Sequence, residues 1–389
     1  MVMYVLSDVP EFMNLLYKSE SCNLLKLNEQ DKYSIIRYDK SMLSKSLYSV
    51  IGLFRSVIVN NEKDVVCFAP PKSMEPSEFI MKYPCGENIY CQEFVEGTMI
   101  NVFWNKTEWE IATRNVVGAN TSFFKKPNMK TFREMFQEAL VYCKLDFNDL
   151  NNEYCYSFVL QHPENRIVIP FKNPMLYLVS IYKINKLTVE KVSCVEYNKW
   201  IAKGCNVKIP WQENTTNYEE MINKYGSMNT PYDVMGAVFF NSETGERTKI
   251  RNPVYEQVRE LRGNQPKLQY QYLSLRREGK IPNYLLYYPE NKEEFSQFRD
   301  QVHLFTNTLY KNYILCFIKK EKSIGEFSDQ YRTHLYHIHG IYLHNLKHQR
   351  LYVNNTVVQK YVNQLHPSLL MHCLNFHMKK RSIDFLQMS

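Results

Sequence analysis

The pattern of apolar and polar positions divides the chain near residue 255. From about residue 48 to that point, short runs rich in Val, Ile, Tyr and Phe are separated by Gly, Asn and Pro, which predicts β-strands joined by turns. One helix is expected in this range, at about Thr131–Lys144, because its apolar residues recur with a period near 3.6. The runs that we expect to form strands are Ser49–Asn60, Val65–Phe68, Tyr90–Trp104, Glu108–Arg114, Tyr154–Leu160, Met175–Ile184 and Met235–Phe240.

After Pro253 the period becomes helical. In Glu293–Lys319 the apolar positions recur at steps of three and four residues, as on one face of an amphipathic helix. We expect further helices at Asp329–Lys347 and Thr356–Leu365, and a last one at Pro367–Phe376, because proline is favoured in the first turn of a helix. The sequence therefore predicts an α+β protein, with a β-rich domain over residues 1–255 and an all-helical domain over residues 256–389.

Composition and charge set broad limits on function. The chain of 389 residues is 44% hydrophobic and 23% charged, which is the ordinary balance of a globular protein. Its formal net charge of +8 favours polyanionic partners, but over this length it is no signature of nucleic-acid binding by itself. Aromatic residues reach 14%, and we expect most of these rings to pack at half-buried positions rather than to stack on bases.

Cysteine usage and the N-terminal residues bear on the compartment. The ten cysteines include no C-x-x-C pair, and Cys67, Cys155 and Cys316 lie inside apolar runs. They are typical of reduced, buried thiols in a cytosol-like compartment, not of a disulfide framework or a zinc site. We expect no signal peptide and no membrane span, because the chain lacks both a positive N-terminal stretch before an apolar core and a run of about 18 apolar residues. The expected localisation is cytoplasmic.

Generic catalytic patterns are absent from the β-rich half. It contains no phosphate-binding G-x-x-x-x-G-K-[ST], no G-x-G-x-x-G and no nucleophile elbow. Five short segments occur instead in a fixed order. They are Gly52-Leu53-Phe54-Arg55, Glu93-Phe94-Val95-Glu96-Gly97-Thr98, Thr113-Arg114-Asn115, Tyr156-Ser157-Phe158-Val159, and Val234-Met235-Gly236-Ala237 with Thr248-Lys249-Ile250-Arg251.

This ordered set resembles the phage-type RNA ligases of the covalent nucleotidyltransferase superfamily, and Asn165-Arg166-Ile167-Val168 adds to the similarity. The resemblance covers roughly residues 45–255 and implies an antiparallel β-sheet nucleotidyltransferase fold with a nucleotide cleft between its sheets. In that family a lysine in K-x-D-G attacks the α-phosphate of ATP and holds the adenylate as a phosphoramidate. Glutamates from two later strands hold the nucleotide and the metal, and a K-x-K pair neutralises the triphosphate.

The chain departs from this pattern at three positions that carry chemistry. The lysine falls on Phe94, and the two glutamates fall on Ser157 and Met235. A phenylalanine cannot form a phosphoramidate, and a methionine cannot bind a hard cation through oxygen. We therefore expect no catalytic residues, no metal and no cofactor. Whether the three side chains fill the former cleft or leave it open is not decided by the sequence.

The basic side of the family pattern is better retained. Candidate phosphate- or nucleotide-binding residues are Arg55, Glu96, Gly97, Arg114, Lys249 and Arg251. Two interpretations stay open. The cations bind a nucleotide or an RNA end without reacting, because unpaired cations attract anions. Alternatively they pair with surface carboxylates such as Glu96 and Glu246.

Two further groups of residues invite functional interpretations. On a helix, His337, His344 and His348 would lie near one face, but no Cys or carboxylate completes a metal site there, which favours a hydrogen-bonded or solvated group. The full group is His334, His337, His339, His344 and His348. Two basic runs are interpreted as solvated faces, with an RNA-contacting surface as the alternative. They are Arg259, Arg262, Lys267, Arg276, Arg277 and Lys280, followed by Lys379, Lys380 and Arg381.

Three functional hypotheses follow. The first is a catalytically inactive RNA ligase-like protein that acts as a binding or structural module for RNA or protein partners. The second is an active ATP-dependent RNA ligase or nucleotidyltransferase that uses ATP and magnesium with a non-standard lysine, for which Lys82 and Lys106 are nearest in sequence. The third is a non-covalent sensor of nucleotide or phosphate. Abundant Asn, Tyr, Lys and Ile are compatible with the genome of a large DNA virus and with a virion-associated role. The oligomeric state stays open.

Overall fold

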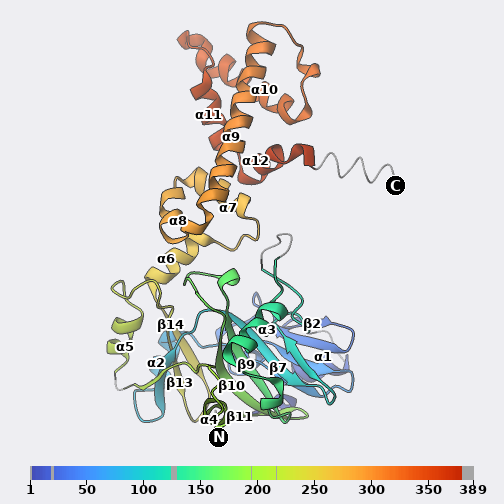
Figure 1. Cartoon of the computed structure of the whole chain (residues 1–389), viewed down its shortest axis with the longest axis vertical. Helices are drawn as coiled ribbons and strands as arrows, with labels where there is room; N and C mark the ends of the chain where they lie inside the picture. Colours follow the sequence, from blue (N-terminus) through green and yellow to red (C-terminus); the bar gives the residue numbers. More distant parts are fainter. Residues whose placement is uncertain (1, 19–21, 124–128, 194, 216, 379–389) are drawn as a thin grey trace. The chain divides into compact units, whose positions relative to one another are not determined.

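The computed structural model describes residues 2–18, 22–123, 129–193, 195–215 and 217–378. It divides into two compact units, Met1–Arg259 and Glu260–Ser389. The division lies within helix α6 (Pro253–Arg262), a few residues beyond the boundary expected after residue 255. The first unit is β-rich and the second is helical (Figure 1), so the chain has the α+β class expected from its sequence.

Antiparallel sheets form the framework of the first unit. The six-stranded sheet has the order β1-β11-β10-β9-β7-β8, and its strands are β1 (Val2–Val5), β11 (Thr188–Val192), β10 (Met175–Asn185), β9 (Tyr154–Gln161), β7 (Thr98–Trp104) and β8 (Trp109–Ala112). A four-stranded sheet has the order β12-β6-β13-β14, with β12 (Gln212–Asn214), β6 (Ile89–Glu93), β13 (Gly236–Asn241) and β14 (Arg247–Arg251). A second four-stranded sheet contains β2 (Leu25–Glu29), β3 (Tyr33–Tyr38), β4 (Val57–Asn60) and β5 (Val65–Phe68) in chain order.

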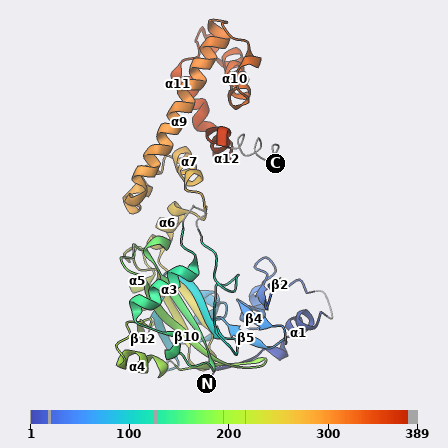
Figure 2. The same ribbon diagram turned by 45° about the vertical axis from the view of Figure 1, so that its right-hand side comes forward.

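Helix α3 (Phe132–Cys143) covers one face of the six-stranded sheet (Figure 2). It is the helix expected at Thr131–Lys144. Thr131 caps its first turn in a reciprocal capping box with Glu134, and Lys144 ends it in the left-handed conformation. Its apolar face, including Phe136 and Leu140, packs against Phe158 of β9 in a continuous buried core.

The expected bounds of two strands are wrong. The run Tyr90–Trp104 is not one strand, because the chain leaves β6 after Glu93 and enters a different sheet at Thr98. The first half of Ser49–Asn60 contains a 3₁₀ turn, Ile51–Leu53, and only Val57–Asn60 is a strand. Both errors have the same cause: a run of β-favouring residues does not report where the backbone changes direction.

The expectation of one helix in the β-rich range is also wrong. Further helices within its described part are α2 (Pro76–Lys82), α4 (Val195–Ala202) and α5 (Tyr218–Tyr225), and α1 (Pro10–Tyr17) precedes that range. Each has only seven or eight residues. Helices of two turns give too few repeats for a clear 3.6-residue period.

The second unit is a helical assembly. Its helices after α6 are α7 (Leu268–Glu278), α8 (Ile281–Tyr287), α9 (Lys292–Tyr313), α10 (Asp329–Ile341), α11 (Asn355–Gln364) and α12 (Pro367–Leu374). The long helix α9 packs against α7, α10, α11 and α12 and buries Phe295, Val302 and Leu309. Both α9 and α10 continue into single π-helical turns, at Ile314–Ile318 and Tyr342–Leu346. Among the described residues, no helix is both long and apolar enough to cross a membrane.

Candidate anion-binding cavity

A cavity of about 230 Å³ lies between the first four-stranded sheet and the six-stranded sheet. Its walls come from β6, β13 and β14 on one side and from Met99 of β7, Val159 of β9 and Val179 of β10 on the other. Five cationic side chains and one carboxylate line it: Arg55, Arg247, Lys249, Arg251, Arg259 and Glu93. The cavity therefore lies where the sequence resemblance implies a nucleotide cleft, and its lining is strongly basic.

Strand β14 supplies three of these cations because side chains alternate between the two faces of a strand. Arg247, Lys249 and Arg251 face the cavity. Between them, Thr248 donates a hydrogen bond to the main-chain oxygen of Met74 (2.9 Å), and Ile250 packs in the core on the opposite face. The neighbouring strand β13 alternates in the same way, so the sheet separates a basic cavity from an apolar core.

Phe94 is the residue that the sequence resemblance places at the lysine nucleophile. Its half-buried ring lines the cavity. Lys249 Nζ lies 4.4 Å from the ring centroid and Arg251 Cζ lies 5.5 Å from it. Both are cation–π contacts, which contribute roughly 0.5–2 kcal/mol according to how far the cation is desolvated. Phe94 thus holds two cations at the cavity wall, and the cavity stays open beside it.

Gly97 allows the chain to cross from one sheet to the other beside Phe94. Its φ of +151° is strained for any residue with a side chain, and a Cβ atom would lie 2.5 Å from the main-chain oxygen of Leu160 and 2.6 Å from Val159 Cγ1. The glycine is therefore required by the backbone path and by the close approach of β9. It lines the cavity without donating a side chain to it.

The cations lower one another's pKa. Burial lowers the pKa of Lys249 well below its usual range, and the charges of Arg247, Arg55, Arg251 and Lys72 lower it further. Burial, Arg247 and Arg114 likewise lower the pKa of Arg55 to about 10. Arg247 is buried, donates two hydrogen bonds to the main-chain oxygens of Pro70 and Pro71, and has an Nε atom without a hydrogen-bond partner. Such a cluster is destabilising by itself and favours binding of an anion.

Few carboxylates oppose these charges. Glu256 forms ion pairs with Arg251 (2.6 Å) and Arg259 (3.0 Å) at the edge of the cavity. The pKa of Glu93 is raised by burial, which disfavours its charged form. No carboxylate contacts Arg55 or Lys249 among the residues that the structure describes.

Glu96 and Glu246 do not pair with these basic residues, so the expected carboxylates are wrong, although pairing with a carboxylate does occur for Arg251, with Glu256. The buried carboxylate of Glu96 accepts hydrogen bonds from the main-chain nitrogens of Ile167, Val168 and Ile169, at 3.0–3.3 Å, and does not line the cavity. Burial raises its pKa even though these bonds oppose the shift. The carboxylate of Glu246 is paired with Lys82 at 2.7 Å.

Met235, Ser157 and Arg114, the remaining positions of the family pattern, lie in different places relative to the cavity. Met235 lines the cavity, whereas Ser157 is a buried residue of β9 and donates a hydrogen bond to Asn101 Oδ1 of the neighbouring strand β7 (2.8 Å). Arg114 lies outside the cavity but is joined to it, because its Nε donates to the main-chain oxygen of Arg55 (3.3 Å). This set fits phosphate groups. Neither Met235 nor Ser157 offers a carboxylate to a hard divalent cation, and among the described residues Glu93 is the carboxylate that lines the cavity.

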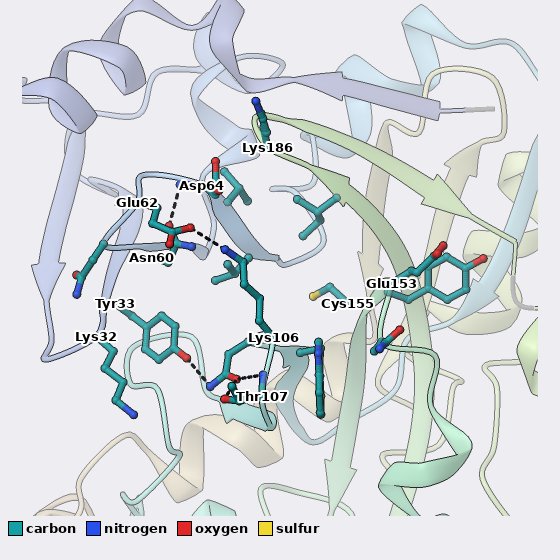
Figure 3. Close-up of a pocket in the computed structure, with 18 residues that line it drawn as sticks. Lys32, Tyr33, Asn60, Glu62, Asp64, Lys106, Thr107, Glu153, Cys155 and Lys186 are labelled. Carbon is teal, nitrogen blue, oxygen red and sulfur yellow. Dashed lines mark hydrogen bonds and ion pairs between the residues drawn. The ribbon is translucent and has the colours of Figure 1, made fainter.

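Neither lysine considered as a substitute nucleophile lies in this cavity. Lys106 lines a second cavity of about 450 Å³, where its amine points toward Glu62 and forms an ion pair at 2.7 Å (Figure 3). The hydrogen bond to Glu62 raises the pKa of Lys106, and the hydrogen bond to Glu246 raises that of Lys82. Both amines are thereby held protonated, which opposes nucleophilic attack.

The histidine and cysteine groups have local partners. His334 is buried, with Nδ1 2.7 Å from the hydroxyl of Tyr361 and Nε2 3.1 Å from Cys373 Sγ. The ring of His339 stacks on Phe317 with centroids 3.9 Å apart. Among the described residues, no group of three or more His, Cys, Asp or Glu side chains is placed to hold a metal. Cys67 and Cys155 are buried free thiols, and Cys316 is half-buried rather than buried. Lys379, Lys380 and Arg381 lie outside the described residues.

Sequence reasoning missed two cations of the cavity. Arg247 precedes Lys249 by two residues, so strand alternation extended one step backward would have included it. Arg259 was assigned to a solvated basic run, whereas helix α6 brings it to the cavity edge beside Glu256. No local pattern indicates that contact, because it depends on where the helix packs.

The chain is similar in sequence to a known RNA ligase. No protein-family model matches the chain. An RNA ligase of Rhodothermus phage RM378 is 24% identical over 319 residues, which span 72% of this chain and 71% of the phage protein. The chain is an RNA ligase-like protein.

Its other relatives include viral proteins of a different name. An immediate-early protein ICP-46 homolog of Invertebrate iridescent virus 6 is 28% identical over 204 residues, covering 47% of this chain and 42% of the viral protein. The chain thus spans less than half of that relative. Among solved structures, an RNA ligase of Naegleria gruberi has a TM-score of 0.37 at 14% identity, covering 50% of this chain and 58% of the ligase.

Proposed function

We propose that this RNA ligase-like protein is catalytically inactive and binds a phosphate-bearing ligand, a nucleotide or an RNA end, without reacting with it. The observation that carries the proposal is the cavity itself. Lys249 and Arg55 face it without a carboxylate partner, beside the Phe94 ring that replaces the expected nucleophile. A phosphate group would supply the missing negative charge through charge-assisted hydrogen bonds.

The catalytic part of the proposal rests on chemistry that these side chains lack. Adenylate transfer needs a nucleophile on the protein to form a bond to the α-phosphorus, and Phe94 has none. It also needs charge neutralisation by a metal, for which Met235 and Ser157 supply no carboxylate. What remains is a basic cavity suited to binding, so the protein would act as a module that holds RNA or a nucleotide for a partner.

Binding of ATP and of inorganic tripolyphosphate, measured by titration calorimetry, tests this function. We expect both to bind the wild-type protein and the affinity to fall at least tenfold in the variant Lys249→Ala/Arg251→Ala. A matched control, Lys183→Ala/Lys203→Ala, removes two cations from exposed ion pairs of the same unit and should leave affinity within about twofold. Absence of binding to the wild-type protein would contradict the proposal.

One observation favours an active alternative. Lys249 lies beside Phe94 in the cavity, and its lowered pKa increases the fraction of neutral amine. With ATP and magnesium, Lys249 Nζ would attack the α-phosphorus, lose a proton, and form an N–P bond as the bond to the β-phosphate oxygen breaks and pyrophosphate leaves. A covalent adenylate on the wild-type protein that disappears in Lys249→Arg would support this alternative over the first.

A further inference from the structure

The second cavity of the β-rich unit leads to a pair of cysteines. It has a volume of about 450 Å³, and no described residue lines both this cavity and the basic cavity. The two cavities lie toward opposite ends of β4 and β9. Arg55 precedes β4 and Val159 lies in the later half of β9, whereas Asn60 ends β4 and Cys155 lies near the start of β9. Cys155 is among the side chains that line the second cavity (Figure 3).

Cys155 contacts a thiol that belongs to another sheet. Its Sγ lies 3.5 Å from Sγ of Cys67 on β5, a strand of the β2–β5 sheet, whereas Cys155 belongs to the six-stranded sheet. The two cysteines are 88 positions apart in the sequence, and both are buried free thiols. A disulfide needs about 2.05 Å between its sulfurs, so an approach of roughly 1.5 Å would join the two sheets covalently.

The two thiols differ in their access to solution. Cys155 lines the cavity, whereas Cys67 does not belong to its wall and is buried in the apolar core that also contains Phe103 and Tyr182. Burial raises the pKa of the Cys67 thiol well above its ordinary range, and the contact with Cys155 raises it further. Cys67 is thus a poorer nucleophile than an ordinary thiol at neutral pH. A small molecule that enters the cavity from solution therefore meets Cys155 first.

The cavity wall suits a small neutral and polar molecule. Three lysines and three carboxylates line it: Lys32, Lys106, Lys186, Glu62, Asp64 and Glu153. A wall of balanced charge does not select for an ion, in contrast with the basic cavity, which favours anions. The volume lies in the range of roughly 300–1,000 Å³ that is typical of small-molecule sites, so a peroxide has room to enter. Peroxides are neutral and polar, and they oxidise thiols.

We propose that Cys155 is a site of oxidation by a peroxide that enters the second cavity, and that Cys67 then closes a disulfide between the two sheets. The inference is independent of the proposed function, because neither cysteine lines the basic cavity. Cys155 is the thiol that reacts with the oxidant. Cys67 is the thiol that resolves the oxidised product, since its sulfur already lies against that of Cys155.

The oxidation proceeds in two steps. The Cys155 thiolate attacks one peroxide oxygen, the O–O bond breaks, and Cys155 becomes a sulfenic acid while the leaving hydroxide takes up the proton that the thiol released. The sulfur of Cys67 then attacks Cys155 Sγ, the S–O bond breaks, and the second hydroxide takes the Cys67 proton. Two thiols lose two electrons, and one molecule of hydrogen peroxide is reduced to two molecules of water.

Peptide mapping of the full chain tests the site and needs no variant. The reduced protein is treated with hydrogen peroxide, the remaining thiols are blocked with iodoacetamide, and the protein is digested without reduction for mass spectrometry. We expect a pair of peptides linked through Cys67 and Cys155, which separates after dithiothreitol. The half-buried thiols Cys22, Cys85 and Cys316 report whether the oxidant has acted. Absence of the linked pair while these thiols are oxidised would overturn the inference.

Single variants separate the roles of the two thiols. In Cys67→Ala the sulfenic acid of Cys155 has no resolving partner, so dimedone, which reacts with sulfenic acids, should label Cys155 several-fold more than in wild type. In Cys155→Ala it should not label Cys67 above the background of untreated protein. Cys91→Ala, which removes a buried thiol of β6, is the matched control and should keep the linked pair at the wild-type level. Equal labelling of Cys67 and Cys155 in the two variants would overturn the assigned roles.

The disulfide should also stabilise the β-rich unit. It would join residues 88 positions apart, and a cross-link of this kind lowers the entropy of the unfolded chain. We expect peroxide-treated wild type to unfold at a higher temperature than the reduced protein, and dithiothreitol to reverse the rise. Peroxide should produce no such rise in Cys155→Ala. A rise of equal size in Cys155→Ala, or a linked wild-type protein that unfolds at a lower temperature, would overturn the covalent link between the sheets.

Discussion

Lys249 Nζ lies 4.4 Å from the centroid of the Phe94 ring, so the side chain that replaces the expected nucleophile contacts a cation that the family pattern assigns to phosphate binding. This contact explains how the cavity tolerates the substitution. The ring offers its negative face to an amine that has no carboxylate partner. The cavity wall is therefore basic at Phe94, whose own side chain carries no nucleophile.

The first prediction concerns the stability cost of Lys249. Its folded-state pKa lies below the unfolded value, so the unfolded chain binds more protons between the two values and stability rises with pH through that window. The cost is fully present below the folded-state pKa of Lys249 and disappears as pH rises through the unfolded value. We expect Lys249→Met to raise the free energy of unfolding by about 1–3 kcal/mol in urea titrations without phosphate.

Lys203→Met provides the matched control for Lys249. Lys203 is exposed and paired with Asp149, so its replacement should change stability by less than about 1 kcal/mol. Tripolyphosphate should stabilise the wild-type protein more than Lys249→Met, because a ligand stabilises the state that binds it. A Lys249→Met protein less stable than wild type would contradict the electrostatic account.

Gly97 should be intolerant of any side chain. In Gly97→Ala the new Cβ would meet the main-chain oxygen of Leu160 at 2.5 Å in a strained backbone conformation. We expect a loss of about 3 kcal/mol or more, measured by urea unfolding. Gly204→Ala has a similar backbone penalty at φ +82° but open space around the Cβ, so it should cost only about 1 kcal/mol. Equal losses in the two variants would show that the contact with β9 is unimportant.

We expect Glu96 to stabilise the fold and not to contribute to ligand binding. In Glu96→Gln the main-chain donors of Ile167, Val168 and Ile169 lose a charged acceptor, and an amide group is brought against them. Stability should fall by about 2–3 kcal/mol, while affinity for tripolyphosphate should stay within twofold under conditions where the variant is folded. If Glu96→Gln loses much of its affinity for tripolyphosphate while its stability is unchanged, this role of Glu96 is wrong.

Lowering the pH should destabilise the helical unit, and we expect His334 to account for part of this effect. Burial lowers its pKa below 6.5, with a smaller contribution from His337, so the unfolded chain binds the proton more tightly. The stabilising contribution of the neutral ring is present above pH 6.5 and is lost as pH falls toward the folded-state pKa. We expect the melting temperature to fall less between pH 7 and pH 5 in His334→Gln than in wild type. His303→Gln, at an exposed position of α9, should retain the wild-type dependence.

Much of the framework could be predicted from the sequence. Strand β5 was expected with the bounds that it has, and α3 was expected within one residue at each end, because alternation and a capped 3.6-residue period are strong local signals. The crossing at Phe94–Gly97 could not be predicted, since strand-forming residues continue on both sides of it. That crossing is what places Phe94 against Lys249.

The site was predicted in part for similar reasons. Residues that lie close together along a strand, such as Lys249 and Arg251, were found together because alternation places them on one face. Contacts between distant segments left no local signal. The pairing of Glu246 with Lys82 depends on how helix α2 packs against β14.

We propose that the protein binds phosphate without forming a covalent adenylate. Incubation of the purified chain with α-labelled ATP and magnesium, followed by denaturing electrophoresis, distinguishes this from ligase chemistry. We expect no labelled band from the wild-type protein, although ATP binds it. A labelled band that is lost in Lys249→Arg would refute this proposal and identify Lys249 as the nucleophile.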